Sequence, residues 1–354
     1  MNSQKSLRVS NLNRSKIRSF MEEKGLKTLL LLGRGNIVYA TGFREPSGAL
    51  VMTRDCGDTL VVPLLDYHRA LVGLPRDVEV KAYHRPGEES LRGDVPERDL
   101  IAGGLQEAIV GVVEKCYPNP GPVGIDLNWA PAGLVRGLEA KLQLTDYSSD
   151  IARIRSVKSE EEVELIESSL RIAEEALRRA LSEAREGVSE LELAGLISYE
   201  MKKLGAWSEA FPTIVAFYAN TSYPHHTPTQ LKLTVPGPLL VDLGAVLEGY
   251  HSDLTRTTWW GHGGLEFRQV IEAVVEAQER AIDTISPGVE AWEPDRSARL
   301  VLEKRGLLKY FNHGLGHGVG VEIHEEPYLR PGSKSVLEKG MIVTVEPGVY
   351  IPGV

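Results

Sequence analysis

Cysteine is scarce in this sequence, and the patterns that mark secreted, membrane-bound or nucleic-acid-binding proteins are missing. The 354 residues include two cysteines, Cys56 and Cys116, which give neither a disulfide framework nor the spacing of a metal site. No apolar run is long enough to span a bilayer, and the N-terminus has no apolar signal-peptide region. A net charge of −9 argues against nucleic acid and anionic membranes as partners. We therefore expect a cytoplasmic protein.

The length and composition allow two domains with sizeable cores. Hydrophobic residues make up 42% of the chain and charged residues 25%, which is typical of a soluble globular protein. Helical and strand-like patterns alternate up to about Asp150, so we expect an α/β domain over residues 1–150 and a second domain over residues 151–354. Val38 stands where a dinucleotide fingerprint starting at Gly33 needs its third glycine, so no nucleotide site is expected there.

Hydrophobic periodicity and capping signals predict the individual elements. Ser159 with Glu162, and Ser189 with Glu192, form capping boxes that open two helices. The predicted helices cover residues 14–24, 97–115, 131–141, 160–186, 190–204, 265–285 and 294–305, and the predicted strands cover residues 28–32, 49–53, 58–62, 122–126, 211–217 and 341–345.

Two aspartates stand in what looks like a β-hairpin around residues 247–249. If the turn is centred between Leu247 and Glu248, Asp242 lies directly opposite Asp253 on one face of the pair. Two facing carboxylates repel each other and are costly to bury, and a cation between them would remove both problems. Paired metal ions in hydrolases lie about 3.5–4 Å apart, so such a pair could bind both. The alternative is that one aspartate faces solvent and the other closes a turn.

Other candidate site residues lie downstream of the hairpin and just before it. His317 is surrounded by glycines, which allow the backbone to approach another group closely, and Glu346 ends a predicted strand. Carboxylates with one imidazole suit Mn²⁺ or a similar divalent ion better than a structural zinc. Of the adjacent His225 and His226, at most one is expected to enter a site, because neighbouring side chains in an extended loop point apart.

The remaining histidines are weaker candidates. His324 followed by Glu325 invites the zincin motif, but Pro327 would break the required helix and Tyr328 stands where the second histidine should be. A lone histidine is more often structural than a ligand. We therefore expect the others to be surface or structural residues: His68, His84, His251, His262 and His313.

Taken together, these segments resemble a known family. PHH, VDLGAVLEGYHSDLTRT, HGLGHGVGVEIHEEP and MIVTVEPGVYIP, in this order, resemble the Xaa-Pro dipeptidases (prolidases) and Xaa-Pro aminopeptidases of the methionine-aminopeptidase-like, pita-bread superfamily. RGNIVYATGF is similar to the creatinase-type N-terminal domain, and IARIRSVKSEEEVELI to the junction and first catalytic helix. The resemblance implies an α+β fold, with a creatinase-like α/β domain over residues 1–150 and a pita-bread catalytic domain over residues 151–354.

The resemblance also implies the roles of the site residues. Asp242 would bind one metal ion, Asp253 would bridge two ions, and His317 with Glu346 would hold the other. Those ions would be Mn²⁺ or Co²⁺, with Zn²⁺ or Fe²⁺ possible. A hydroxide shared by the ions would then attack the peptide bond before proline, in Xaa-Pro dipeptides or short peptides. The resemblance implies a homodimer as well, but it does not separate dipeptidase from aminopeptidase.

Two histidines complete the implied site. His225 and His324 match the histidines of the family that are not ligands. In the family these residues bind the substrate carbonyl or carboxylate and help to transfer protons.

Two departures from the family pattern matter for activity. Ala216–Tyr218 replaces the Ala-Ser-Gly that often precedes the first histidine. The chain stops at Val354, before the Gly-x-Arg-x-Glu-Asp strand that supplies a fifth, bridging ligand, so we expect a truncated copy. Three alternatives remain open: a metal-free hydrolase such as creatinase, a non-catalytic binding module on the same fold, and an inactive truncated copy.

Overall fold

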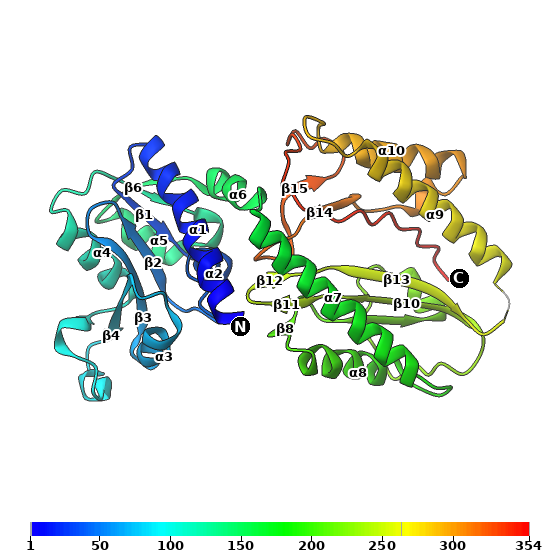
Figure 1. Ribbon diagram of the computed structural model, residues 1–354, viewed down its shortest axis with the longest axis horizontal. Helices are drawn as coiled ribbons and strands as arrows, with labels where there is room; N and C mark the ends of the chain where they lie inside the picture. The colour runs from blue at the N-terminus through cyan, green and yellow to red at the C-terminus, as the bar shows by residue number, and fades with distance from the viewer. Residues whose placement is uncertain (1, 263, 354) are drawn as a thin grey trace. The chain divides into compact units, whose positions relative to one another are not determined.

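The chain forms two compact units. The computed structural model describes residues 2–262 and 264–353, and its contacts divide the chain into a unit that ends at Ile154 and a unit that begins at Arg155 (Figure 1). No helix of the described residues is long and apolar enough to cross a membrane. Each unit has its own buried core, so each is described separately.

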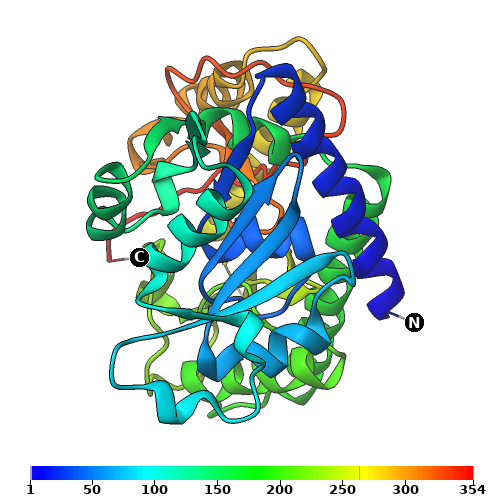
Figure 2. The same ribbon diagram turned by 90° about the vertical axis from the view of Figure 1, so that its left-hand side faces the viewer.

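The N-terminal unit is built on one seven-stranded sheet with the strand order β5-β4-β3-β2-β1-β6-β7. This unit faces the viewer in Figure 2. Its strands are β1 (Thr28–Leu31), β2 (Ala49–Thr53), β3 (Gly57–Pro63), β4 (Val78–His84), β5 (Leu100–Ala102), β6 (Pro122–Ile125) and β7 (Gln143–Asp146). Its helices are α1 (Asn2–Glu23), α2 (Arg34–Thr41), α3 (Tyr67–Gly73), α4 (Leu105–Cys116), α5 (Ala132–Glu139) and α6 (Ser148–Ser156), the last of which continues into the second unit. The sheet is mixed, because β1, β2 and β3 pair antiparallel and the other neighbours pair parallel.

One predicted helix of this unit is shorter than its pattern suggested. The helix expected over residues 97–115 begins only at Leu105, and residues 97–102 form a 3₁₀ turn followed by β5. Gly103 has a φ of 124°, a conformation that a continuing helix does not contain. A helix therefore cannot run through Gly103, and the capping contact between Glu107 and the backbone of Gly104 starts α4.

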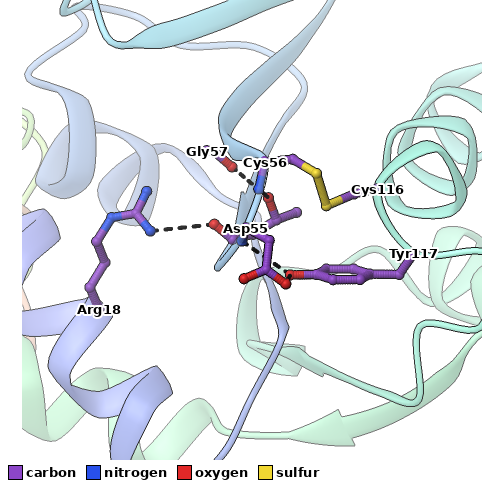
Figure 3. The surroundings of a disulfide bond; sticks show 7 residues. Arg18, Asp55, Cys56, Gly57, Cys116 and Tyr117 are labelled. Carbon is purple, nitrogen blue, oxygen red and sulfur yellow. Dashed lines mark hydrogen bonds between the residues drawn. A yellow bond between two sulfur atoms is a disulfide. The ribbon is translucent and has the colours of Figure 1, made fainter.

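The two cysteines, whose number and spacing give no disulfide framework, nevertheless form a disulfide bond. Cys56, in the turn between β2 and β3, is bonded to Cys116, the last residue of α4, over a sequence separation of 60 residues (Figure 3). The Tyr117 hydroxyl donates to Asp55 Oδ2 at 2.8 Å and accepts from the Asp55 backbone N–H at 3.1 Å. Spacing alone could not show this pairing, because it depends on where the sheet places the end of α4.

The C-terminal unit combines two helix pairs with several short sheets. Its helices are α7 (Glu160–Glu183), α8 (Glu190–Lys203), α9 (Leu265–Thr284) and α10 (Trp292–Lys304). Its strands are β8 (Ser208–Glu209), β9 (Ile214–Phe217), β10 (Gly237–Leu243), β11 (Ala245–Leu247), β12 (Tyr250–His251), β13 (Leu254–Trp260), β14 (Gly316–Gly318) and β15 (Glu325–Leu329). They pair in the orders β13-β10-β9, β12-β11-β8 and β14-β15.

Each helix pair covers its own core. The capping boxes at Ser159 and Ser189 are both present, as predicted, and start α7 and α8. The apolar faces of α7 and α8 pack on β9, β10 and β11, whereas α9 and α10 pack with β15 and with Leu315, just before β14 (Figure 1). The C-terminal unit therefore has a helix pair on each side of the strands that carry the candidate site.

The central hairpin forms, but its register differs from the predicted one. Leu247 pairs with Tyr250 and Asp242 with Thr255, so Asp242 and Asp253 are not directly opposite. The turn is centred between Glu248 and Gly249, which have φ values of 51° and 87°. Positive φ at both central residues is the type I′ geometry that suits a twisted hairpin. Asp253 lies two residues from Thr255 along the strand, so the two aspartates are diagonal neighbours on one face.

The last predicted strand, over residues 341–345, is not a strand in the structure. Its residues make only isolated bridges, from Met341 to Val157 and from Val343 to Gly318. Two backbone hydrogen bonds, from Thr344 to His317 and from Glu346 to Leu315, still hold this extended segment beside β14.

Candidate metal centre and cleft

Three predicted site residues from distant parts of the chain meet in the C-terminal unit. Asp253, His317 and Glu346 each offer a ligand atom, and these atoms lie within 4.8 Å of one another. His317 Nε2 is 3.4 Å from Asp253 Oδ2 and 3.2 Å from Glu346 Oε1. The Asp253 and His317 side chains are 9% and 10% exposed, whereas the Glu346 side chain is 32% exposed.

The glycines around His317 allow its strand to approach two neighbouring backbone segments closely, one at Thr344 and one at Glu326. A Cβ on Gly316 would lie 2.1 Å from the Thr344 carbonyl oxygen, and a Cβ on Gly318 would lie 2.4 Å from the Glu326 carbonyl oxygen. Only glycine therefore permits both approaches without a backbone shift. The prediction of a close backbone approach here is confirmed, and the approach places His317 beside Glu346.

Hydrogen bonds orient the imidazole and the carboxylate. His317 Nδ1 donates to the Gly318 carbonyl at 3.0 Å, which turns Nε2 toward Asp253 and Glu346. A histidine that binds metal through one nitrogen commonly donates through the other in this way. The Thr344 hydroxyl donates to Glu346 Oε1 at 2.8 Å and accepts from the His317 backbone N–H at 2.9 Å.

Asp242 borders this cluster from β10 and has an unsatisfied buried atom. Its Oδ1 is buried and has no hydrogen-bond partner among the described residues. Burial, and next the charge of Asp253, raise the pKa of Asp242 to about 7. A buried carboxylate in this position is costly unless a cation or a proton neutralises it. The residues present therefore fit a bound cation.

The charge state of His317 also indicates that positive charge is required among these carboxylates. Burial alone would lower the pKa of His317, but its hydrogen bonds to Asp253 and Glu346 raise it to about 10. Burial would raise the pKa of Glu346, and the hydrogen bond from His317 lowers it below its ordinary value. The imidazolium thus supplies positive charge between the carboxylates. Three carboxylates and one imidazole form a donor set that suits Mn²⁺ or a similar hard divalent ion.

The cluster opens into a large cleft that also contains the two predicted catalytic histidines. The cleft has a volume of about 1960 Å³, and His225 and His324 both line it. The ring of His324 lies 4.3 Å from that of His317, centroid to centroid. Burial, and next the charge of His317, lower the pKa of His324, which favours a neutral imidazole. His226 instead faces Glu190, at 2.9 Å.

Some residues of the site were not found from the sequence. His313 was expected to be a surface or structural residue, but it lines the cleft, and its Nε2 is buried without a hydrogen-bond partner among the described residues. Its place four residues before His317, inside the same glycine-rich segment, was a usable signal. Thr344 gave no such signal, because its role depends on contacts between segments far apart in the sequence.

The fold and the site define a class: a two-unit α+β protein whose C-terminal unit presents a carboxylate-rich centre in a cleft. Residues 164–354 match Metallopeptidase family M24, and residues 14–157 match the Creatinase/Prolidase N-terminal domain. The chain therefore belongs to metallopeptidase family M24. The predicted pita-bread catalytic unit and creatinase-type α/β unit are confirmed.

Similar proteins of known name span nearly the whole chain. The Xaa-Pro dipeptidase of Pyrococcus horikoshii is 31% identical over 97% of this chain and 91% of its own length. The structure of an Xaa-Pro dipeptidase from Bacillus anthracis has a TM-score of 0.83 and 26% identity, and covers 98% of this chain and 92% of that one. The structure of an X-Pro aminopeptidase from Thermotoga maritima has a TM-score of 0.83 and 26% identity, and covers 96% and 90% of the two chains.

Proposed function

We propose that this metallopeptidase hydrolyses the peptide bond before proline in dipeptides or short peptides. The observation that carries the proposal is the convergence of Asp253, His317 and Glu346 within 4.8 Å, at the wall of a cleft large enough for a peptide. Proteins named Xaa-Pro dipeptidase are similar to this chain over nearly its full length, which supports the same substrate class here.

These three residues and Asp242 would hold the metal. Asp242 and Asp253 would supply carboxylate oxygens from the hairpin, and His317 and Glu346 would supply Nε2 and a carboxylate oxygen from the opposite segments. Two divalent ions, Mn²⁺ or Co²⁺ in the first place and Zn²⁺ or Fe²⁺ as further candidates, agree with this oxygen-rich set. Bound divalent metal would lower the pKa of water and so supply the nucleophile near neutral pH.

The uncoordinated histidines would act on the substrate. His225 lines the cleft from the loop after β9, and His324 lies against His317 from the segment before β15. A neutral His324 can accept or donate a proton near neutral pH, and an imidazole N–H can hold the substrate carbonyl oxygen or carboxylate. These two side chains would therefore orient the peptide and carry protons, while the carboxylates and His317 hold the metal.

Among the peptidase activities, we favour that of a dipeptidase. The named curated relatives that cover most of the chain include Xaa-Pro dipeptidases, whereas an aminopeptidase appears among the structural neighbours. A metal-free hydrolase or a non-catalytic binding module would not need the retained carboxylates and His317, so these alternatives are not favoured.

The proposal is tested by assaying the purified chain with a series of peptides. We expect Mn²⁺ or Co²⁺ to support cleavage of Xaa-Pro dipeptides and a chelator to abolish it. The matched control is the same series with alanine in place of proline, which should be cleaved far more slowly. Metal analysis of the same protein should find bound divalent ions. No cleavage of any Xaa-Pro peptide, together with no bound metal, would reject the proposal.

Assembly and location are part of the proposal. We expect a homodimer, which the resemblance to the family implies, and light scattering coupled to size exclusion measures it directly. A cytoplasmic location remains our proposal, and the Cys56–Cys116 disulfide bears on it. Disulfides in cytosolic proteins are rare outside hyperthermophiles, so a cytoplasmic location would indicate such a source.

A further inference from the structure

Glu190 is a fully buried carboxylate outside the metal centre, and it has many partners. It is the first residue of α8, and it is 0% exposed. Its Oε1 accepts from the Phe217 backbone N–H at 2.8 Å and from Asn220 Nδ2 at 2.9 Å. Its Oε2 is 2.9 Å from His226 Nε2 and accepts from the backbone N–H of Thr229 at 2.9 Å and its hydroxyl at 2.7 Å.

These partners all belong to one segment, residues 217–229, which leaves β9 and returns toward the start of α8. Phe217 and Thr229 are its two ends, and Asn220 and His226 lie between them. Two backbone hydrogen bonds, from Glu190 to Leu231 and from Leu191 to Thr229, join the returning chain to the first turn of α8. A single carboxylate therefore fixes the path of the segment at both ends and in the middle.

Burial on this scale would normally favour the neutral acid. Burial would raise the pKa of Glu190, but the hydrogen bonds from Asn220 and His226 lower it below its ordinary value. The N-terminus of a helix also stabilises a negative charge. The carboxylate thus remains ionised and can accept from all of its donors at once.

The segment carries His225, which lines the cleft. Pro224 and His225 form a turn that the His226 backbone N–H closes on the Tyr223 carbonyl at 3.2 Å. The contact between His226 and Glu190 therefore anchors the end of the turn that carries His225. Glu190 itself does not line the cleft, whereas His225 does.

We propose that Glu190 is a positioning residue for the peptidase reaction, and that it acts by holding the 217–229 segment so that His225 faces the substrate. The inference rests on the proposed function only in the role given to His225. The claim that Glu190 fixes the segment stands on the hydrogen bonds themselves.

The test compares Glu190→Gln with a matched control on the same helix. Glutamine has the same shape, but an NH₂ group replaces one of the two carboxylate oxygens. That NH₂ group would face hydrogen-bond donors at either position, so at least two contacts are lost. Glu200, 3% exposed and bonded to Arg179 and Lys203, is a second buried carboxylate of α8. Glu200→Gln should leave kcat unchanged. Glu190→Gln should lower kcat by about 10- to 100-fold, as expected for a misplaced catalytic group, with KM and metal content nearly unchanged.

Two further measurements separate positioning from general damage. In a double-mutant cycle, His225→Ala should cost little further activity in the Glu190→Gln background, because both changes disable the same group. Amide hydrogen exchange over residues 217–229 should accelerate in Glu190→Gln and not in Glu200→Gln. If Glu190→Gln does not fold, Asn220→Ala combined with Thr229→Val removes two of the same contacts from the loop side and serves in its place.

The outcomes also distinguish this inference from the proposed function. Additive losses in the cycle, or an equal loss of kcat in Glu200→Gln, would overturn the positioning role. Wild-type protein without Xaa-Pro activity would reject the proposed function, and the exchange experiment would then decide the inference alone. Unchanged exchange over residues 217–229 in Glu190→Gln would overturn it.

Discussion

Asp253 lies among charged groups of both signs. Its carboxylate faces His317 at 3.4 Å and raises the pKa of Asp242, so it lies between a group of opposite charge and one of like charge. The protonated imidazole of His317 places a positive charge beside these carboxylates. With a divalent ion bound, His317 must release that proton to coordinate through Nε2.

We therefore expect Asp253→Asn to abolish peptidase activity and the pairing of metal ions while the fold is retained. Asparagine keeps the size of the side chain but removes the negative charge and one of the anionic oxygens. Activity and metal content should be measured side by side, with circular dichroism as the control for folding. Unchanged turnover in this variant would show that Asp253 has no part in the reaction.

Glu325 is a second buried charge, and its partners are cations of the chain itself. Its Oε1 is 2.5 Å from Arg155 Nη2 and its Oε2 is 3.2 Å from Lys158 Nζ, with all three side chains at most 6% exposed. Burial would raise the pKa of Glu325, but the charges of Arg155 and Lys158 lower it below its ordinary value. The ionised form is thus bound more tightly in the folded protein.

A depressed folded-state pKa sets the sign of the pH dependence. The stabilisation by Glu325 should be present above its unfolded pKa, about 4.3, and should be lost as the pH falls through the lower folded pKa. Glu325→Gln should lower the free energy of unfolding at pH 7 by about 3–5 kcal/mol, because it removes one side of a buried ion pair. Denaturant unfolding from pH 7 downward measures both effects.

The control for this prediction is an ion pair on the surface. Glu175 pairs with Arg178 and Arg179 on the exposed side of α7. Exposed pairs contribute little to stability, so Glu175→Gln should leave the unfolding curve nearly unchanged. Equal effects of the two substitutions would contradict the assignment of Glu325 as a buried structural charge.

At the scale of elements, β14 is the piece on which the site geometry depends most closely. It carries His317 and contacts the 341–346 segment through its backbone, and Gly316 permits that contact. No strand is assigned over residues 341–345, yet the hydrogen bonds from Thr344 and Glu346 hold the segment in place. The distance between the backbone of β14 and that of the 341–346 segment therefore sets the position of Glu346 relative to His317.

We expect Gly316→Ala to separate β14 from this segment and to reduce both metal affinity and activity. The added Cβ would lie 2.1 Å from the Thr344 carbonyl oxygen, which is backbone and can move only with its segment. Titration calorimetry with Mn²⁺ would report the loss of affinity independently of turnover. Metal affinity equal to that of the wild type would contradict this account of the site.

A second glycine offers the matched control. Gly195 lies within α8, and a Cβ added there meets no atom within 4 Å. Gly195→Ala should therefore leave metal binding intact and raise the stability by roughly 0.5–1 kcal/mol, because alanine loses less backbone entropy in a helix.

At the scale of the whole molecule, the sequence predicted local features better than it predicted the contacts between distant segments. The helices opened by Ser159 and Ser189 formed where their capping boxes stand, because capping is local. The predicted hairpin register was wrong because the turn is centred one residue later than expected, between Glu248 and Gly249. Glu248 has a positive φ, which glutamate rarely adopts, so the sequence did not indicate this turn centre. Glu190 could not be found from sequence, because its partners lie 27 to 39 residues away.

The disulfide is the clearest case of such a distant contact, and it gives a prediction for the N-terminal unit. Cys56–Cys116 closes a loop with a sequence separation of 60 residues, which lowers the entropy of the unfolded chain. On the chain-entropy estimate, a loop of this length is worth about 4 kcal/mol. Reduction, or the double variant Cys56→Ser with Cys116→Ser, should therefore destabilise the first unit and leave the second unaffected.

Hydrogen exchange can resolve the two units in one experiment. Amides of β2, β3 and α4 should exchange faster after reduction, whereas those of β10 and β13 should keep their rates. Peptidase activity at low temperature should persist in the double variant, because neither cysteine belongs to the unit that contains the metal centre. Two titratable thiols in the protein denatured without reductant would show that the disulfide does not form, and equal exchange in the oxidised and reduced proteins would show that it does not stabilise the unit.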